Sequence, residues 1–216
     1  MKRILATSSS FPEDYDRKWK IDVIPFVSID IYPKEKIISQ IPTDIHSFIV
    51  TSKNSAKAIK DIELNGQFFV VGKSTAKKLN GQDREISFIS NYSEDLLERM
   101  LETGIKNYVF FKGNLSLTTL PDILKENGIE VRGIETYKTS LTPQKVTDFY
   151  DAIIFMSPSA VKSFTSMNKI PEETLIFTSG KTTAEAVKQH GNYRVYFPEE
   201  TTKESLITLI NDKLDA

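Results

Sequence analysis

Five short polar turns in this sequence carry the residue types that bind anions. Each follows a short apolar run and combines serine, threonine, glycine or lysine: Thr51-Ser52-Lys53, Gly72-Lys73 with Thr75, Lys112-Gly113, Ser157 with Ser159, and Gly180-Lys181-Thr182-Thr183. Hydroxyl and backbone N–H groups donate hydrogen bonds to anionic oxygens, and a glycine lets the backbone approach a ligand closely. The turns therefore predict a site for a ligand with several anionic groups.

Four of these turns place a lysine directly after a predicted strand, namely Lys53, Lys73, Lys112 and Lys181. Because the formal net charge is only −1, local clustering of cations is the way this chain can favour an anionic ligand. We expect these lysines to line a cleft between two domains and to attract the ligand. The alternative is that they are ordinary solvated loop lysines in a lysine-rich chain.

The hydroxyl groups of these turns also have a purely structural explanation. Thr75, Thr183, Ser157 and Ser159 stand where helices are predicted to begin. Serine and threonine at such positions cap the helix, and their replacement costs about 1 kcal/mol of stability. Capping and ligand binding are compatible, since the backbone amides of the same turn can bind the anion.

The composition excludes several other kinds of chemistry. The chain has no cysteine, which rules out disulfides, thiolate metal sites and cysteine nucleophiles, and with only two histidines we expect no metal site. No basic stripe suggests a nucleic-acid partner. No apolar run approaches the roughly 20 residues that span a bilayer, and the first residues do not form a signal peptide. We therefore expect a cytoplasmic protein without membrane association. No heptad pattern is present, so we expect a monomer.

Short apolar runs alternate with amphipathic runs along the whole chain. The predicted strands, rich in β-branched and aromatic residues, are Arg3–Thr7, Asp22–Tyr32, Ser47–Thr51, Phe68–Val71, Ile86–Ile89, Tyr108–Phe111, Glu130–Tyr137, Ala152–Met156, Thr174–Phe177 and Arg194–Phe197. The predicted helices are Ser55–Ile62, Ser74–Leu79, Glu94–Leu101, Pro121–Glu126, Ser159–Phe164, Thr183–Gln189 and Glu204–Leu214. This alternation predicts an α/β fold with parallel sheets and helices on both faces.

An internal repeat sharpens the fold prediction. Residues 48–56 resemble 154–161, residues 71–76 resemble 179–184, and residues 91–97 loosely resemble 201–206. Three matched blocks in the same order indicate two similar parallel-sheet domains of the flavodoxin or Rossmann kind.

The second copy lacks an opening strand of its own before Ala152, and the start of the chain can supply it. The sequence therefore predicts one domain inserted into the other. The discontinuous domain would comprise residues 1–31 and 139–216, and the inserted domain residues 32–138. Two extended segments, Val23–Tyr32 and Glu130–Thr139, would join them and allow a hinge.

Seven features follow one another in a fixed order: Thr51-Ser52, Gly72 to Ala76, Ser93-Glu94-Asp95, Lys112-Gly113, Tyr137, Ser157-Pro158-Ser159 and Gly180 to Ala184. This ordered set resembles the uroporphyrinogen-III synthase family over almost the whole chain. Two arginines that such chains often carry are absent, because Thr7 to Ser10 follow the first strand and Asn114 to Thr118 follow Lys112-Gly113.

The resemblance implies a reaction and a substrate. The substrate would be hydroxymethylbilane, a linear tetrapyrrole with eight carboxylates, which the turn residues would hold. Loss of its hydroxyl as water gives an azafulvene, and ring closure through a spiro intermediate inverts the last pyrrole to give uroporphyrinogen III. The pyrroles supply the electrons, so no cofactor is expected. Tyr137 would act as general acid or as donor to the leaving hydroxyl, since a phenol is protonated at neutral pH. Its alternative role is a core tyrosine on a crossing strand.

Two other interpretations remain open at this point. A two-domain protein could bind a small anionic ligand without catalysis, although most such proteins are exported. A phosphosugar-binding isomerase domain could use the Thr-Ser turns for phosphate, but no glutamate or histidine stands out as its catalytic residue.

Overall fold

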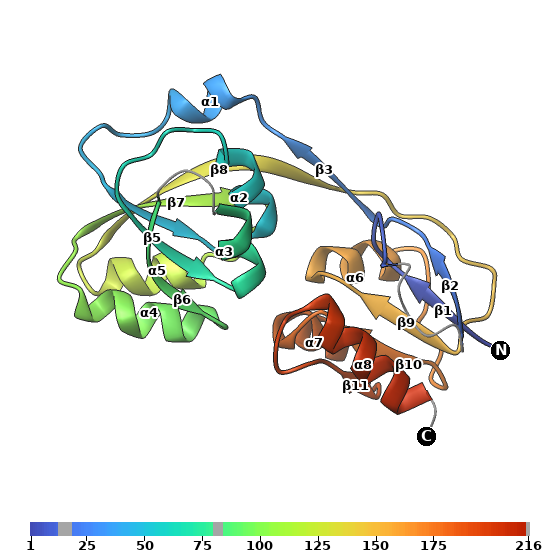
Figure 1. Ribbon diagram of the computed structural model, residues 1–216. Coiled ribbons are helices and arrows are strands. Elements are labelled where there is room, and N and C mark those ends of the chain that lie inside the picture. Colours follow the sequence, from blue (N-terminus) through green and yellow to red (C-terminus); the bar gives the residue numbers. More distant parts are fainter. Residues whose placement is uncertain (13–18, 80–83, 215–216) are drawn as a thin grey trace. The chain divides into compact units, whose positions relative to one another are not determined.

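The contacts in the computed structural model, which describes residues 1–12, 19–79 and 84–214, divide the chain into two compact units (Figure 1). The discontinuous unit comprises Met1–Ser28 and Ser140–Ala216, and the inserted unit comprises Ile29–Thr139. Each unit is built on its own sheet.

The inserted unit contains a six-stranded sheet in the order β3-β8-β7-β4-β5-β6. Its strands are β3 (Val27–Ile31), β4 (Ser47–Val50), β5 (Gln67–Val71), β6 (Glu85–Ser90), β7 (Asn107–Gly113) and β8 (Glu130–Leu141). Its helices are α1 (Lys34–Ile38), α2 (Lys53–Ile59), α3 (Lys73–Leu79), α4 (Ser93–Glu102) and α5 (Thr119–Glu126). Neighbouring strands from β8 through β6 run parallel.

The discontinuous unit contains a five-stranded parallel sheet in the order β11-β10-β9-β1-β2. Its strands are β1 (Lys2–Ala6), β2 (Trp19–Val23), β9 (Ala152–Phe155), β10 (Leu175–Thr178) and β11 (Val195–Tyr196), and its helices are α6 (Pro158–Thr165), α7 (Lys181–Lys188) and α8 (Lys203–Leu214). The order matches β6-β5-β4-β7-β8 of the other sheet, so the sequence repeat corresponds to a repeated topology. The start of the chain supplies β1, which pairs with β9.

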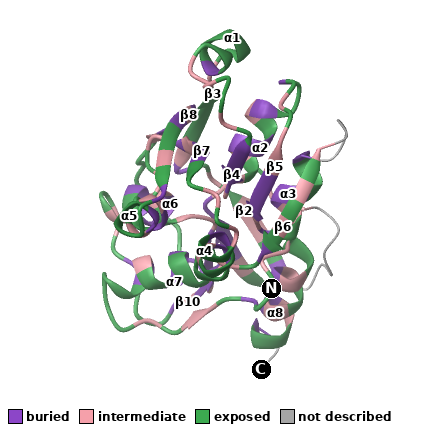
Figure 2. Cartoon of the chain, turned by 90° about the vertical axis from the view of Figure 1, so that its left-hand side faces the viewer, coloured by how far each residue is buried: buried purple, intermediate pink, exposed green. Residues whose placement is uncertain are grey.

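Both sheets are buried on two faces, which explains why their central strands are apolar without interruption. In β9, Ile153 and Phe155 pack with α6 and α7, whereas Ala152 and Ile154 pack with α8. Figure 2 shows β4 coloured as buried along its length and β5 coloured as buried in its middle. The predicted α/β class with parallel sheets is therefore confirmed.

The sequence prediction was wrong for one long strand. The segment Asp22–Tyr32 is not continuous, because β2 ends at Val23 and β3 begins at Val27. Pro25 lies between them and has no backbone N–H to donate to a ladder. Phe26 turns inward at this break and is fully buried in the core of the discontinuous unit. The short helix α1, which follows Pro33, was not predicted.

An ionic network in the discontinuous unit joins Arg3, near the amino end of β1, to Asp22 of β2 and to two aspartates that precede β9. The guanidinium of Arg3 donates to the carboxylates of Asp22 at 2.6 Å and Asp148 at 2.9 Å, and the Arg3 backbone N–H donates to Asp151 at 2.7 Å. Hydrogen bonding to Arg3 lowers the pKa of Asp22. Burial, reinforced by the charge of Asp22, raises the pKa of the neighbouring Tyr150 to about 12. The network therefore favours a neutral phenol beside a paired carboxylate.

The raised pKa of Tyr150 makes a prediction about alkaline stability. A free tyrosine titrates near pH 10, so the stability that depends on the neutral phenol is complete below about pH 10 and is lost as the pH rises towards 12. We expect Tyr150→Phe to lose less stability over that interval than the wild type does. Urea denaturation at a series of alkaline pH values measures this, and equal pH slopes for the two proteins would contradict it.

Candidate functional site

Most of the predicted site residues lie at the carboxyl ends of neighbouring strands within each unit. In the inserted unit the turns after β7, β4 and β5 adjoin because these three strands are neighbours in the sheet. In the discontinuous unit the turns after β9 and β10 adjoin for the same reason. Ligands of open parallel α/β sheets bind beyond these strand ends, which makes both edges candidates for ligand binding.

The turn after β4 combines a helix cap with exposed donors. Ser52 caps α2, because its hydroxyl accepts a hydrogen bond of 3.0 Å from the backbone N–H of Ser55. Thr51 is half-buried, and Lys53, the first residue of α2, is exposed. Ser52 thus satisfies the Ser55 amide, which is one of the first four N–H groups of α2 that the backbone of a helix does not itself pair. The structural and the ligand-binding explanations therefore both fit this turn.

The turn after β5 depends on a glycine. Gly72 has φ 87°, a conformation that residues with a Cβ rarely adopt, and its N–H donates to the Ser90 carbonyl at 2.7 Å. Thr75 is 4% exposed in the first turn of α3. The exposed Lys73 lines a hollow of about 370 Å³ at the end of β6, together with Phe88, Ile89, Ser90, Asn91 and Asp95. This hollow joins one predicted lysine to backbone and side-chain polar groups at the strand ends.

The turn after β9 is held by serines. Ser157 caps α6 by accepting from the Ala160 N–H at 3.2 Å, and its hydroxyl lies 3.0 Å from that of Ser159. Ser157 and Ser159 are both half-buried, and their mutual contact uses both hydroxyls within the turn.

The turn after β10 differs from its counterpart after β5. Gly180 precedes α7 in an extended conformation with φ 172°, which any residue can adopt. A Cβ at Gly180 would nevertheless come within 3.2 Å of the Thr201 methyl group. Thr183 is 4% exposed with its hydroxyl 3.4 Å from that of Ser179, whereas Lys181 and Thr182 are exposed on the first turn of the helix.

Tyr137 lies on β8 with its ring against the end of β7. A Cβ placed on Gly113 would be 2.4 Å from the Cζ atom of Tyr137 and 2.8 Å from its hydroxyl oxygen. The phenol therefore occupies space that exists only because residue 113 is glycine. Tyr137 is 9% exposed, so the ring is covered. Gly113 is itself buried, and its lack of a side chain leaves the space in which this ring packs.

The prediction that Lys112 stands in a turn after a strand was wrong. Lys112 lies within β7, which extends to Gly113. A Cβ on Gly133 would meet the Lys112 Cε at 3.1 Å, so the lysine stem runs over that glycine of β8. Gly133 pairs with Phe110, two residues before Lys112. The stem thus points back from the strand end, unlike Lys53, Lys73 and Lys181, which begin helices.

Three polar residues beside Tyr137 were not predicted. The Thr136 hydroxyl lies 3.0 Å from the Ser55 hydroxyl and 3.1 Å from the Lys112 carbonyl, and both Thr136 and Ser55 are completely buried. Their pairing joins α2, β7 and β8, and no local sequence signal reveals a contact over 81 residues. Asn114 hydrogen-bonds to Thr139, and an asparagine directly after a strand-end glycine is a turn signal that could have been noticed.

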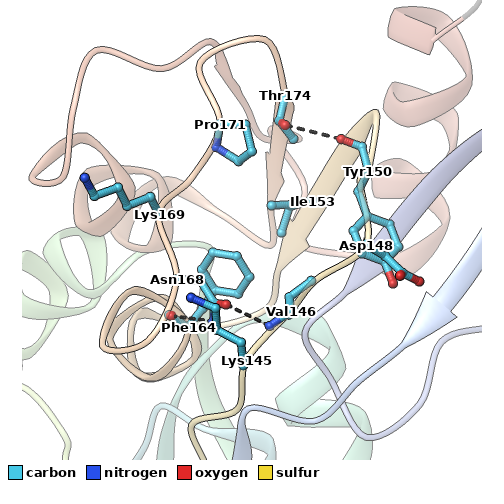
Figure 3. A pocket seen from close by; sticks show the side chains of 10 residues that line it. All are labelled: Lys145, Val146, Asp148, Tyr150, Ile153, Phe164, Asn168, Lys169, Pro171 and Thr174. Atoms are coloured by element: carbon cyan, nitrogen blue, oxygen red, sulfur yellow. Dashed lines mark hydrogen bonds between the residues drawn. The ribbon is translucent and has the colours of Figure 1, made fainter.

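A second hollow lies in the discontinuous unit, at the end of its sheet opposite to the turns that follow β9 and β10 (Figure 3). It has a volume of about 110 Å³, and its lining includes Tyr150 and Thr174, which shortly precede β9 and β10, and Asn168 and Lys169 after α6. The amino ends of the strands lie here, so this hollow is separate from the strand-end turns.

Within the described residues, no group of three or more histidine, aspartate or glutamate side chains could hold a metal ion.

These features define a class of protein: two similar parallel α/β units, each with hydroxyl, amide and lysine groups at the carboxyl edge of its sheet. The family described as uroporphyrinogen-III synthase HemD matches residues 16–208. The chain belongs to the uroporphyrinogen-III synthase family, whose members are cyclising lyases of tetrapyrrole biosynthesis. The resemblance inferred from the ordered turns is therefore confirmed.

Solved structures of uroporphyrinogen-III synthases share the fold of this chain. The uroporphyrinogen-III synthetase of Helicobacter pylori is 20% identical with a TM-score of 0.67, and the match covers 99% of this chain and 100% of that one. A mutant uroporphyrinogen III synthase of the extremely thermophilic bacterium Thermus thermophilus is 16% identical with a TM-score of 0.71, over 100% and 99% of the two chains. A comparison of the sequence with curated proteins found no match. Among the residues that the structure describes, every helix is too short or too polar to cross a membrane.

The seat of Tyr137 makes a testable prediction about packing. Gly113→Ala should displace the Tyr137 ring and lower the free energy of unfolding by about 1–3 kcal/mol, as overpacking does. Gly133→Ala is a matched control on the adjacent strand, because its Cβ meets only the flexible Lys112 stem, and we expect a change below about 0.5 kcal/mol. Urea denaturation measures the free energy of unfolding of both variants. Equal small decreases would show that the Tyr137 ring does not depend on the space beside Gly113.

Proposed function

We propose that this chain converts hydroxymethylbilane into uroporphyrinogen III, with loss of water and inversion of the last pyrrole ring. The observation that carries the proposal is the placement of Tyr137. Its phenol sits in a glycine notch at the carboxyl edge of the inserted sheet, beside turns that present serine, threonine, lysine and backbone amides.

Tyr137 is the proposed proton donor. The first step breaks the bond between the terminal methylene carbon and its hydroxyl, and the pyrrole nitrogen supplies the electron pair that leaves an azafulvene. Hydrogen bonding from a neutral phenol makes the hydroxyl a better leaving group, because it stabilises the negative charge that develops on oxygen. The far pyrrole then attacks through its substituted carbon, and the spiro intermediate fragments and recloses. No external electron donor is required.

The turns are the proposed carboxylate-binding groups. The residues in this role are Thr51, Ser52, Lys53, Gly72, Lys73, Thr75, Lys112, Gly113, Ser157, Ser159, Gly180, Lys181, Thr182 and Thr183. Lysine side chains supply charge, and the amides at the starts of α2, α3, α6 and α7 supply directed donors at the positive ends of helices. The hollow beside Lys73, with a volume of about 370 Å³, has room for a carboxylate arm of one pyrrole.

Positioning of the substrate decides the product. Closure without the enzyme joins the ends directly and gives the symmetric type I isomer, so the protein must hold the chain for attack at the substituted carbon. Orientation of this kind contributes about 7–11 kcal/mol in favourable systems. We propose further that the enzyme acts as a cytoplasmic monomer without a nucleic-acid partner, on the sequence grounds given above.

A direct assay tests the function. The purified protein is supplied with hydroxymethylbilane, and the oxidised product is separated by chromatography into type III and type I isomers. We expect type III. Type I alone would refute catalysis and favour the alternative of a two-domain protein that only binds an anionic ligand.

Tyr137→Phe tests the proton donor. Removal of the hydroxyl should lower kcat by about 10²-fold, the lower range for a general acid, and change KM little. Tyr108→Phe is the matched control in the same unit, because its hydroxyl lies 2.9 Å from that of Thr103 and has no proposed part in the reaction. Steady-state kinetics on both variants decides the matter, and full activity of Tyr137→Phe would remove this tyrosine from the mechanism.

Charge reversal tests the lysines. Lys53→Glu combined with Lys181→Glu should raise KM by about tenfold or more and lower kcat far less, because the lysines attract the substrate and take no part in the chemistry. The effect should shrink at high salt. A KM equal to that of the wild type at low salt would show that these are ordinary solvated lysines.

A further inference from the structure

We propose that Asn114 is a positioning residue that fixes Tyr137 in its reactive place. This inference rests on the proposed role of Tyr137 and concerns how the chain holds that side chain. The starting observation is a set of hydrogen bonds from Asn114 to Tyr137 itself and to Thr139, two residues further along β8.

The parallel ladder between β7 and β8 becomes irregular beside Tyr137. Lys112 pairs with Glu135, but the next residue, Gly113, pairs with Tyr137, so one residue of β8 is left without a partner in the register. Such a bulge twists a strand and re-aims its side chains. The backbone of β7 then turns away, with the Ser116 N–H donating to the Gly113 carbonyl at 3.2 Å. β8 therefore loses its backbone ladder with β7 directly after Tyr137.

Asn114 replaces that missing partner. Its backbone N–H donates to the Tyr137 carbonyl at 3.3 Å. Its side-chain Oδ1 accepts from the Thr139 N–H at 2.7 Å, and its Nδ2 donates to the Thr139 carbonyl at 3.2 Å. A carboxamide offers one acceptor and two donors in the plane of a peptide group, so it can satisfy both backbone groups of one residue. The ladder is thus extended beyond the end of β7 by a side chain.

The clamp, formed by Asn114 with Thr139, leaves Tyr137 little freedom. On one side Thr136 is buried and bonded to the Lys112 carbonyl, and on the other Thr139 is bonded to Asn114. With the backbone fixed on both sides and the ring seated on Gly113, the phenol oxygen has a defined position. Asn114 thereby acts on the reaction through Tyr137, and no contact of its own with substrate is needed.

The chain contains a matched control for this clamp (Figure 3). In the discontinuous unit Asn168 accepts from the Val146 N–H at 2.8 Å and donates to the Gln144 carbonyl at 2.8 Å and the Phe164 carbonyl at 3.0 Å. This second carboxamide performs the same kind of backbone bridging beside the hollow at the amino ends of the strands. Its loss should affect stability alone.

The experiment compares Asn114→Ala with Asn168→Ala in the intact chain. For Asn114→Ala we expect kcat to fall between about tenfold and a hundredfold, KM to change less than about twofold, and the share of type I isomer to rise. For Asn168→Ala we expect wild-type kcat and isomer ratio with a lower Tm. Wild-type kcat and isomer ratio in Asn114→Ala, or equal kinetic losses in both variants, would overturn the inference.

Two further measurements separate this inference from the proposed function. Amide hydrogen exchange at Thr139 should accelerate in Asn114→Ala whatever the chemistry, and unchanged protection there would overturn the clamp. In the Tyr137→Phe background, Asn114→Ala should have little further effect on kcat, because both changes remove the same contribution. If Tyr137→Phe is impaired and Asn114→Ala still lowers kcat independently, the inference fails and the proposed function stands. If Tyr137→Phe is fully active, the proposed role of the tyrosine fails, and the inference with it.

Discussion

Burial of both sheets on two faces is the constraint from which the placement of the site follows. A strand such as β9 has apolar neighbours above and below, so each of its side chains must be apolar and none can do chemistry. Polar groups are tolerated where the chain leaves the sheet, at the strand ends and the first turns of the helices. The same packing fixes which strands are neighbours, and so which turns meet at the edge of each sheet.

The turns both begin helices and are proposed to bind anions, and different groups of each turn serve these two roles. Ser52 and Ser157 cap helices with their hydroxyls, while the first helical turns that follow present backbone amides. Gly72 is needed for its backbone conformation, whereas its repeat counterpart Gly180 is extended and is constrained by the nearby Thr201 methyl group. Equivalent positions of the repeat have thus kept one residue type for different physical reasons, and a glycine in a motif does not by itself identify an anion-binding backbone.

The fold class was predictable because strand-like and helix-like runs alternate along the sequence and because one pattern of turns occurs twice in it. The runs around Ile153 and Phe48 indicate buried strands, and the repeated Gly-Lys-x-Thr-Ala turns indicate two copies. Prediction failed where a tertiary contact decided the outcome. Pro25 and the inward turn of Phe26 broke a segment that resembles one continuous strand, and Lys112 was placed in a turn although β7 continues past it. The buried pair of Ser55 and Thr136 could not be found, since neither residue type signals a partner far along the chain.

The pairing of β1 with β9 has a consequence for synthesis of the chain. Ile4, Leu5 and Ala6 are fully buried in the folded protein, yet their register partners on one side begin at Ala152. While the ribosome makes the intervening residues, this first strand has an unsatisfied edge and an uncovered apolar face. Strands β4 to β7 lie wholly within the inserted unit, so that unit can fold on the nascent chain first. It would also bring the distant segments closer and shorten the loop that must close. The insertion that shapes the enzyme thus also imposes an order of folding and a period in which its first strand is open to aggregation or chaperone binding.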